Sequence, residues 1–169
     1  MLQKRECMKK NDKPLLIFDY DGTLHHTIEI YEPAVKTVYQ GLVEEGLVPP
    51  QELKRERIAG WLGMNRQEMW EDLAGNLSLP KQEAAAKEVA KQMKKQIEMG
   101  YARWYPGVRE VLDRLKQDGY PMVILSNCSI VYKETNWKEF QLEQWFQKFY
   151  DCESYGFAPK TEIIKTSSQ

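Results

Sequence analysis

The sequence is poor in cysteine and has no long hydrophobic run. Its three cysteines, Cys7, Cys128 and Cys152, form no C-x-x-C pair, so we expect neither a disulfide framework nor a structural zinc site. Such sparse cysteine is typical of a reducing, cytoplasmic setting. No apolar run approaches the roughly 20 residues that cross a bilayer, and the run LLIF near the start is too short for a signal peptide. We therefore expect no membrane partner.

An excess of either charge is also lacking. The 24 basic and 25 acidic residues give a formal net charge of −1, so nothing global attracts the chain to nucleic acid. The hydrophobic and charged fractions, 42% and 29%, are ordinary for a globular protein and exclude a disordered or fibrous class. A length of 169 residues suits one domain, or one core domain with a modest insertion.

Short apolar runs and helical periods alternate along the chain. The runs at 14–18 and 122–125 lack polar alternation, which is typical of strands buried on both faces of a parallel sheet. Amphipathic spacing and capping signals predict helices over 28–43, 51–58, 65–74, 79–99, 108–119 and 136–147, with Asn65 as an N-cap, and a short third strand over 149–152. This order predicts an α/β core with a helical insertion after the first strand.

Two carboxylates follow the first predicted strand. Asp19 and Asp21 are one residue apart, so in extended chain both side chains meet above the same sheet edge. Gly22 frees the backbone for a tight exit, and Thr23 offers a hydroxyl at the turn. The carboxyl ends of buried parallel strands are where open α/β sheets bind ligands. A turn rich in Asp and Gly has the same composition, so these residues alone leave both interpretations open.

Further segments decide between them. DYDGTL resembles D-x-D-G-T-L, the first signature of the haloacid dehalogenase-like hydrolase superfamily. WYPGVREVLDRLKQDGYPMVILSN resembles the segment leading to the second motif, with Ser126 at its hydroxyl position. GFAPKTEI carries Lys160 at the position of the third motif's lysine. The helices between the first two motifs resemble the helical cap of the phosphoglycolate phosphatase and β-phosphoglucomutase group, and the resemblance covers about residues 14–165.

The resemblance implies a haloacid dehalogenase-like Rossmannoid α/β core with a parallel sheet and an inserted α-helical cap. The corresponding boundaries are 14–24 and 105–169 for the core, 25–104 for the cap and 1–13 for a charged lead-in. The implied activity is magnesium-dependent hydrolysis of a small phosphorylated metabolite through an aspartyl-phosphate. A β-phosphoglucomutase-like phosphomutase and a non-catalytic protein that binds phosphate or a partner are the alternatives.

The resemblance also implies a role for each motif residue. Asp19 is expected to be the nucleophile, and Asp21 to protonate the leaving oxygen and then activate water. Ser126 and Lys160 are expected to hold the phosphoryl oxygens. The Asp19 carboxylate and the Asp21 backbone carbonyl are expected to bind Mg²⁺. Gly22, Thr23 and Asn127, which adjoin the motifs, are candidate substrate-binding residues.

Other polar residues allow two interpretations each. Arg66 lies in a segment that resembles a substrate-specificity loop, where it would meet a second anionic group, but an exposed helix arginine is equally consistent. His25 and His26 could contact substrate, although a solvated hinge position is favoured. The lysines at 87, 91 and 95 could form a polyanion patch, although a solvated helix face is favoured.

The family's fourth motif, an acidic cluster after a further strand, does not follow Lys160. Glu162 is too close to Lys160 to replace it, so we expect a shortened form of a longer enzyme. The strands that would flank the first strand are missing with the motif. Residues 15–18 are therefore expected at a sheet edge with exposed apolar side chains, which favours self-association through this edge.

Overall fold

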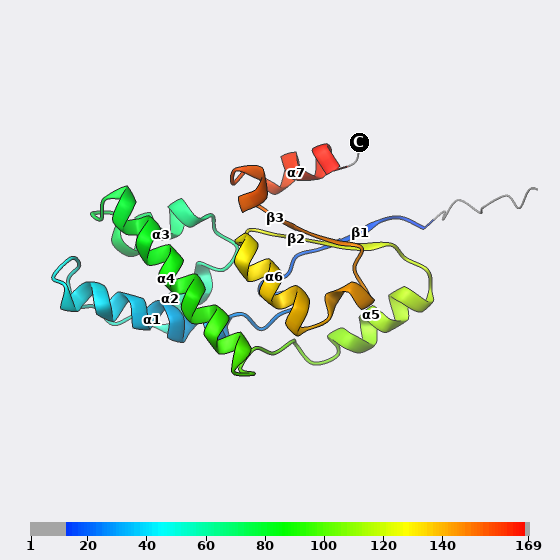
Figure 1. Ribbon diagram of the computed structural model, residues 1–169, viewed down its shortest axis with the longest axis horizontal. Coiled ribbons are helices and arrows are strands. Elements are labelled where there is room, and N and C mark those ends of the chain that lie inside the picture. Colours follow the sequence, from blue (N-terminus) through cyan, green and yellow to red (C-terminus); the bar gives the residue numbers. More distant parts are fainter. Residues whose placement is uncertain (1–12, 168–169) are drawn as a thin grey trace, which may run out of the picture.

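A computed structural model describes residues 13–167 of the chain (Figure 1). Cys7 and nearly all of the predicted lead-in lie outside the described residues. The strands are β1 (Leu16–Phe18), β2 (Met122–Ser126) and β3 (Lys148–Asp151). The helices are α1 (Ile28–Glu44), α2 (Arg55–Gly60), α3 (Arg66–Ala74), α4 (Leu79–Glu98), α5 (Val108–Gln117), α6 (Ile130–Glu139) and α7 (Lys160–Ser167), with short 3-10 helices η1 (Leu142–Gln144) and η2 (Glu153–Tyr155).

The three strands form one parallel sheet in the order β1-β2-β3. Ile17 lies opposite Val123, and Leu125 lies opposite Tyr150. Every residue of β2 is buried, as its continuous apolar sequence predicts for the central strand of a parallel sheet. The predicted α/β class with a parallel sheet is therefore confirmed.

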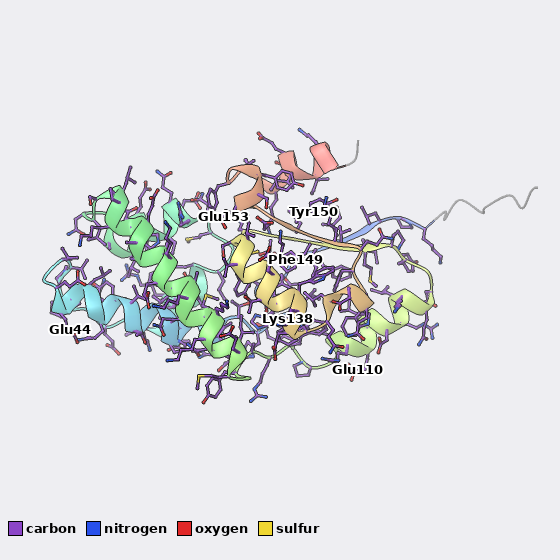
Figure 2. All side chains as sticks on the ribbon, viewed as in Figure 1. Glu44, Glu110, Lys138, Phe149, Tyr150 and Glu153 are labelled. Carbon is purple, nitrogen blue, oxygen red and sulfur yellow. The ribbon has the colours of Figure 1, made fainter. Side chains whose placement is uncertain are left out.

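Helices cover both faces of the sheet. In Figure 1, α5 and α6 lie on one face and α7 lies on the other. Alternate residues of the strands divide between two apolar clusters: Ile124 and Phe149 join the main core, whereas Leu125 joins Ile163 of α7 in a small second cluster. Figure 2 shows Phe149 and the following Tyr150 on opposite sides of β3. The main core continues without a break into the helices that precede α5.

Helices α1 to α4, here called the helical insertion (residues 28–98), stand between β1 and α5 in the chain. Apolar stripes on α1 and α4 pack against each other, and α4 also packs against α6. The predicted N-cap is confirmed: the Asn65 side chain accepts a hydrogen bond from the Glu68 N–H in a capping box. Because α6 starts just beyond the end of β2, its contact with α4 holds the insertion beside that end of the sheet.

The helix predicted over 136–147 is wrong in its bounds. The helix α6 begins earlier, because the Ser129 side chain accepts a hydrogen bond from the Tyr132 N–H and caps it. It ends before Gln141, whose φ of 50° interrupts the helical backbone ahead of η1. The aromatic residues Trp145 and Phe146, which extended the apparent period, are buried in the connection to β3 instead.

Within residues 13–167, no helix combines the length and the apolar character that crossing a membrane requires. Cys128 and Cys152 are buried free thiols. The cytoplasmic setting stays a prediction.

The sheet order places β1 at an edge of the described sheet. Leu16 and Phe18 pack against the main core, so Leu15 and Ile17 point to the other face. There Leu15 is 50% and Ile17 is 43% exposed, because α7 covers the sheet over β2 and β3. Apolar side chains beside an unpaired strand edge are a template for pairing with another chain.

We propose that a second copy of this chain pairs along β1, and we expect Ile17→Lys to weaken that association. A lysine on this face adds charge and removes buried apolar area, so the dissociation constant should rise about tenfold or more. Sedimentation velocity over a range of protein concentrations measures it. Val111→Lys, which changes a 55% exposed valine on α5, is the matched control. A wild-type protein that is monomeric at every concentration would contradict the proposal.

Candidate active site

The turn after β1 is closed by hydrogen bonds onto a single carbonyl. The backbone N–H groups of Thr23, Leu24 and His25 donate to the Tyr20 oxygen at 3.3, 3.0 and 3.0 Å. Gly22 adopts a φ of 75°, which a residue with a side chain rarely takes, and its N–H donates to the His25 oxygen at 3.0 Å. This closed turn fixes the direction in which both aspartates leave the strand.

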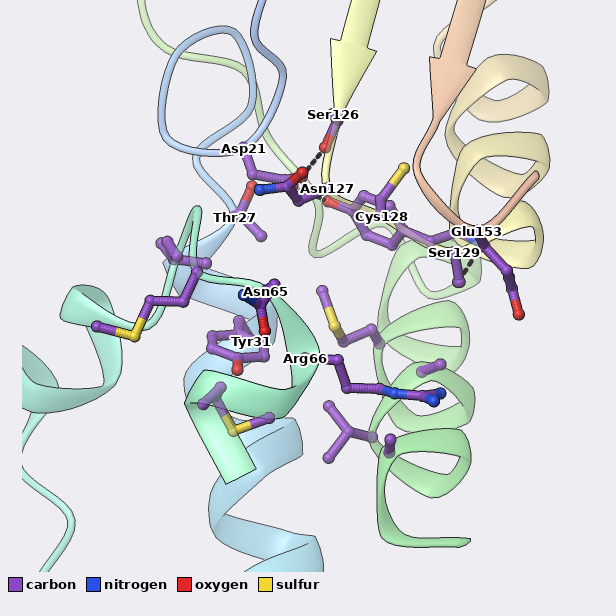
Figure 3. A pocket seen from close by; sticks show the side chains of 18 of the residues that line it. Asp21, Thr27, Tyr31, Asn65, Arg66, Ser126, Asn127, Cys128, Ser129 and Glu153 are labelled. Atoms are coloured by element: carbon purple, nitrogen blue, oxygen red, sulfur yellow. Dashed lines mark hydrogen bonds between the residues drawn. The ribbon is translucent and has the colours of Figure 1, made fainter. Parts of the chain in front are cut away.

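The structure brings the four predicted catalytic residues to one end of a cavity of about 630 Å³. The Lys160 ammonium, at the start of α7, donates to Asp19 Oδ1 over 2.8 Å. The Ser126 hydroxyl, at the end of β2, donates to Asp21 Oδ2 over 2.7 Å, as Figure 3 shows. Lys160 is 141 positions from Asp19 in the sequence, and Ser126 is 105 positions from Asp21. Each pair nevertheless meets near the carboxyl ends of the strands.

Two further hydroxyls bind the second aspartate. Thr27 and Tyr132 donate to Asp21 Oδ1 over 2.8 and 2.7 Å. Burial raises the pKa of the Asp21 carboxyl above its usual value, and the charge of Asp19 adds to this, whereas the three donated hydrogen bonds lower it. A carboxyl group with these neighbours can hold a proton at a higher pH than an exposed one. The sequence alone does not predict that Tyr132 belongs to the site, because helical periodicity does not show that its hydroxyl contacts the end of a distant strand.

Behind these hydroxyls lies His25, which the favoured interpretation placed at a solvated hinge. That interpretation is wrong for His25, which is 0% exposed and stacks on the Tyr20 ring with centroids 5.3 Å apart. The loop turns its ring inward because its neighbours in the chain pair with residues 103–105. His26 is part-exposed and lies 3.7 Å from Glu29.

The hydrogen bonds of His25 fix its tautomer. Its Nδ1 lies 2.8 Å from Thr27 Oγ1 and 3.1 Å from the Tyr132 hydroxyl. Both hydroxyls are within donating distance of Asp21, and this arrangement favours the neutral tautomer in which Nδ1 carries the hydrogen. Nε2 has no hydrogen-bond partner among residues 13–167. Burial, with a smaller effect of His26, lowers the pKa of His25 to about 3, so the ring is neutral near pH 7.

The remaining candidates lie in different surroundings. Gly22 and Thr23 are exposed in the turn and do not line the cavity of the described chain. Asn127 lines the cavity and donates to the Gly63 carbonyl over 2.9 Å, which ties the end of β2 to the helical insertion. Arg66 also lines the cavity, and Figure 3 shows it at a distance from Asp21, on the helical insertion.

The lysine row of α4 is exposed, as expected for a solvated face, yet Lys87 and Lys91 also line the cavity. Arg66 lines the same cavity, and the Lys91 ammonium pairs with Glu88 at 3.3 Å. The helical period of α4 does not predict which of its faces lies near the aspartates, because that depends on how α4 packs against α6.

Few hard oxygen ligands are available for a metal ion. No group of three or more His, Cys, Asp or Glu side chains within residues 13–167 could hold one. Asp151, at the end of β3, is bound by Lys133 at 2.5 Å and by Ser154. The Asp19 carboxylate and the Asp21 carbonyl remain. This set fits Mg²⁺, which is held by one or two carboxylates together with waters and substrate phosphate.

Comparison with known proteins assigns the family. The sequence profile of the haloacid dehalogenase-like hydrolases matches residues 16–168. The chain belongs to this family. No match is found among curated proteins.

Solved structures share the fold of this haloacid dehalogenase-like chain. A predicted phosphatase from Clostridium acetobutylicum has a TM-score of 0.69 and 19% identity over 82% of this chain and 61% of its own. A predicted phosphoglycolate phosphatase from Haemophilus somnus has a TM-score of 0.68 and 17% identity, covering 88% and 74%. CbbY from Rhodobacter sphaeroides, solved with phosphate, has a TM-score of 0.65 and 18% identity, covering 81% and 62%. The chain therefore spans less than two thirds of the length of several relatives.

We expect His25→Leu to change how stability depends on pH. The unfolded chain protonates His25 below its ordinary pKa of 6.5, whereas the folded chain does so only near 3, so His25 makes folding less favourable as the pH falls between these values. The unfolding free energy of the wild type, relative to the variant, should drop by about 1.4 kcal/mol per pH unit between about pH 6 and pH 4.

Urea unfolding followed by tryptophan fluorescence at each pH measures this difference. The comparison with the variant is needed because Asp21, whose pKa is raised, contributes a slope of opposite sign in both proteins. A difference that does not vary with pH would show that His25 is protonated in the folded chain.

Proposed function

We propose that this haloacid dehalogenase-like chain is a magnesium-dependent phosphomonoester phosphatase that acts through an aspartyl-phosphate. The observation that carries the proposal is the pairing of Lys160 with Asp19 and of Ser126 with Asp21 at one end of a cavity. A nucleophile, a cation, and a proton donor beside a hollow are what phosphoryl transfer requires, since its catalysis is mostly positioning and charge stabilisation. The substrate class is a small phosphorylated metabolite.

Asp19 is the proposed nucleophile. Its Oδ1 accepts hydrogen bonds from Lys160 and from the Tyr20 N–H, which leaves Oδ2 for the attack. As the bond from this oxygen to phosphorus forms, the ester P–O bond breaks. The Lys160 ammonium stabilises the negative charge on the phosphoryl oxygens during the transfer.

Asp21 moves the proton in both halves of the reaction. Its burial-raised pKa favours the protonated form, which gives its proton to the departing alcohol oxygen. The carboxylate so formed then removes a proton from the water that attacks the aspartyl-phosphate, and inorganic phosphate leaves. The hydrogen bonds from Ser126, Thr27 and Tyr132 orient the carboxyl group and keep its pKa from rising too far for the second half.

Mg²⁺ would be held by the Asp19 carboxylate and the Asp21 backbone carbonyl, and when bound it neutralises charge between the carboxylate and the phosphate. Because the described residues offer so few ligands, we propose a weak magnesium site. We further propose that residues 25–104 act as a cap over a core formed by 14–24 and 105–169.

We expect Asp19→Asn to abolish phosphatase activity and Lys160→Ala to reduce it about a hundredfold, because the first removes the nucleophile and the second a charge that stabilises the transition state. Activity is measured on an alkyl and an aryl phosphate at increasing Mg²⁺, with an EDTA control. Lys165→Ala, on the same helix α7, is the matched control and should retain full activity.

The intermediate is tested by rapid quench with a ³²P-labelled ester. Label on the wild-type protein that is lost in Asp19→Asn supports the aspartyl-phosphate. Transfer of the label to a sugar phosphate in place of water would identify a phosphomutase instead. Phosphate binding without turnover at any Mg²⁺ concentration would contradict a catalytic role for the chain.

We expect Tyr132→Phe to move a pH limb as well as lower the rate. Loss of its hydrogen bond should raise the pKa of Asp21 further. For an alkyl phosphate, whose leaving oxygen needs a proton, the alkaline limb of kcat/KM should shift upward by about 0.5 to 1 pH unit. The same shift should appear in an NMR titration of the Asp21 carboxyl carbon.

Tyr20→Phe is the matched control, because the Tyr20 hydroxyl donates to Asn136 in the same buried cluster and makes no hydrogen bond to Asp21. A limb that stays in place in Tyr132→Phe would mean that Tyr132 contributes packing alone.

A further inference from the structure

Three apolar side chains that line the cavity are open to solvent. Met64 before α3 is 42% exposed, Val131 on α6 is 49% exposed, and Phe157 before α7 is 45% exposed. Single exposed apolar residues are ordinary on a protein surface. Three of them, from three separate segments around one cavity, form an apolar patch of the kind that marks a binding site.

The deeper wall of the cavity continues this apolar character. Leu62, Met69, Trp70, Val89 and Met93 of the helical insertion all line it. Methionine side chains adapt to the shape of a ligand, and an indole offers a flat surface. The hollow above the reactive aspartates is therefore suited to an apolar group, in a volume of about 630 Å³ that is typical of ligand pockets.

Three neutral polar side chains of the wall are occupied within the protein, whereas the buried Trp70 Nε1 has no hydrogen-bond partner among residues 13–167. The Asn65 side-chain oxygen accepts from Glu68 N–H, and the Asn127 amide donates to the Gly63 carbonyl. The Ser129 hydroxyl oxygen accepts from the Tyr132 N–H. A sugar would bring several hydroxyl groups into this space, and each hydroxyl buried without a partner weakens binding.

The backbone at Phe157 holds its ring at the cavity. Its φ of 60° is a conformation that bulky side chains rarely adopt, and its N–H donates to the Cys152 carbonyl over 2.7 Å. Strain of this kind persists where the surroundings enforce it, often at binding sites. The Arg66 guanidinium lies 4.9 Å from the centre of the ring, so Arg66 stacks on an aromatic surface beside the cavity.

We propose that this cavity selects phosphomonoesters whose organic group is aromatic or otherwise apolar, in preference to sugar phosphates. The proposal rests on the proposed function, because Lys160 and the aspartates at the reactive end supply the site for the phosphate. The phosphate fixes one end of the ligand, and the apolar wall of the insertion binds the other.

Binding of non-hydrolysable phosphonates tests this preference without turnover. Isothermal titration calorimetry with the full chain and Mg²⁺ compares benzylphosphonate, 2,3-dihydroxypropylphosphonate and inorganic phosphate. We expect benzylphosphonate to bind about tenfold or more tightly than the other two, because only its ring removes apolar surface from water. Lys160→Ala should weaken the binding of all three, because it removes the phosphate anchor.

Variants of the wall locate the preference. Met64→Ser and Val131→Ser should each lower the affinity for benzylphosphonate about threefold while leaving inorganic phosphate unchanged. Met99→Ser and Val111→Ser change residues outside the cavity lining that are somewhat more exposed, at 57% and 55%, and should alter neither affinity.

Each contrary result has a distinct meaning. Dihydroxypropylphosphonate binding as tightly as benzylphosphonate, or more tightly, overturns the apolar preference and leaves the proposed phosphatase intact. Benzylphosphonate binding unchanged in Lys160→Ala overturns the assignment of a phosphomonoester. Failure of inorganic phosphate and both phosphonates to bind overturns the phosphate site, and with it both proposals.

Discussion

The convergence of three hydroxyl groups on the Asp21 carboxyl group holds the reactive end of this protein together. Ser126 ends β2, Thr27 precedes α1 and Tyr132 lies on α6, so one carboxyl group joins the sheet, the helical insertion and the helix that packs against it. Because Asp21 leaves β1 through a turn closed on a single carbonyl, its position also fixes that of Asp19 and the contact with Lys160. The relative placement of core and insertion therefore depends on the same residue that is proposed to move the proton.

Burial of the Asp21 carboxyl group and the hydrogen bonds donated to it shift its pKa in opposite directions. Desolvation raises the pKa of Asp21 because it makes the charged form costly, and the three donated hydrogen bonds offset part of this cost. His25 completes the arrangement as a neutral donor to two of these hydroxyls. A protonated histidine here would place a second charge in the buried cluster. With Nδ1 as the donor, the Thr27 and Tyr132 hydroxyls accept from His25 and donate to Asp21.

Residues identified by local pattern were predictable, whereas those defined by tertiary contacts were not. Strand ends and the D-x-D spacing placed Asp19 and Asp21 together, and the capping signal at Asn65 needed only its own helix. Ser126 and Lys160 required the family resemblance, since 105 and 141 positions separate them from their partners. The burial of His25 and the hydrogen bond from Tyr132 to Asp21 depend on how distant segments pack over the turn. Helical periodicity in the sequence does not predict such tertiary contacts. The predicted helix over 136–147 differs from α6 for a related reason, because Trp145 and Phe146 extend the apolar period although they pack from a loop.

The reactive end and the wall of the cavity come from different parts of the chain. Strand ends and α7 supply the aspartates, Ser126 and Lys160, whereas the helical insertion supplies most of the apolar surface together with Arg66 and lysines of α4. Substitutions in the insertion can therefore alter which organic group is bound while the hydrogen bonds to Asp21 stay in place. The two parts are linked where Asn127 donates to the Gly63 carbonyl and where Arg66 stacks on Phe157. These contacts join the start of α3 and the loop before it to segments that follow β2 and β3, so they help to set the distance between the apolar wall and the proposed phosphate site. Under the proposal, a phosphomonoester that spans both parts is held by a charged contact at the reactive end and by apolar burial against the insertion, and this burial favours one organic group over another.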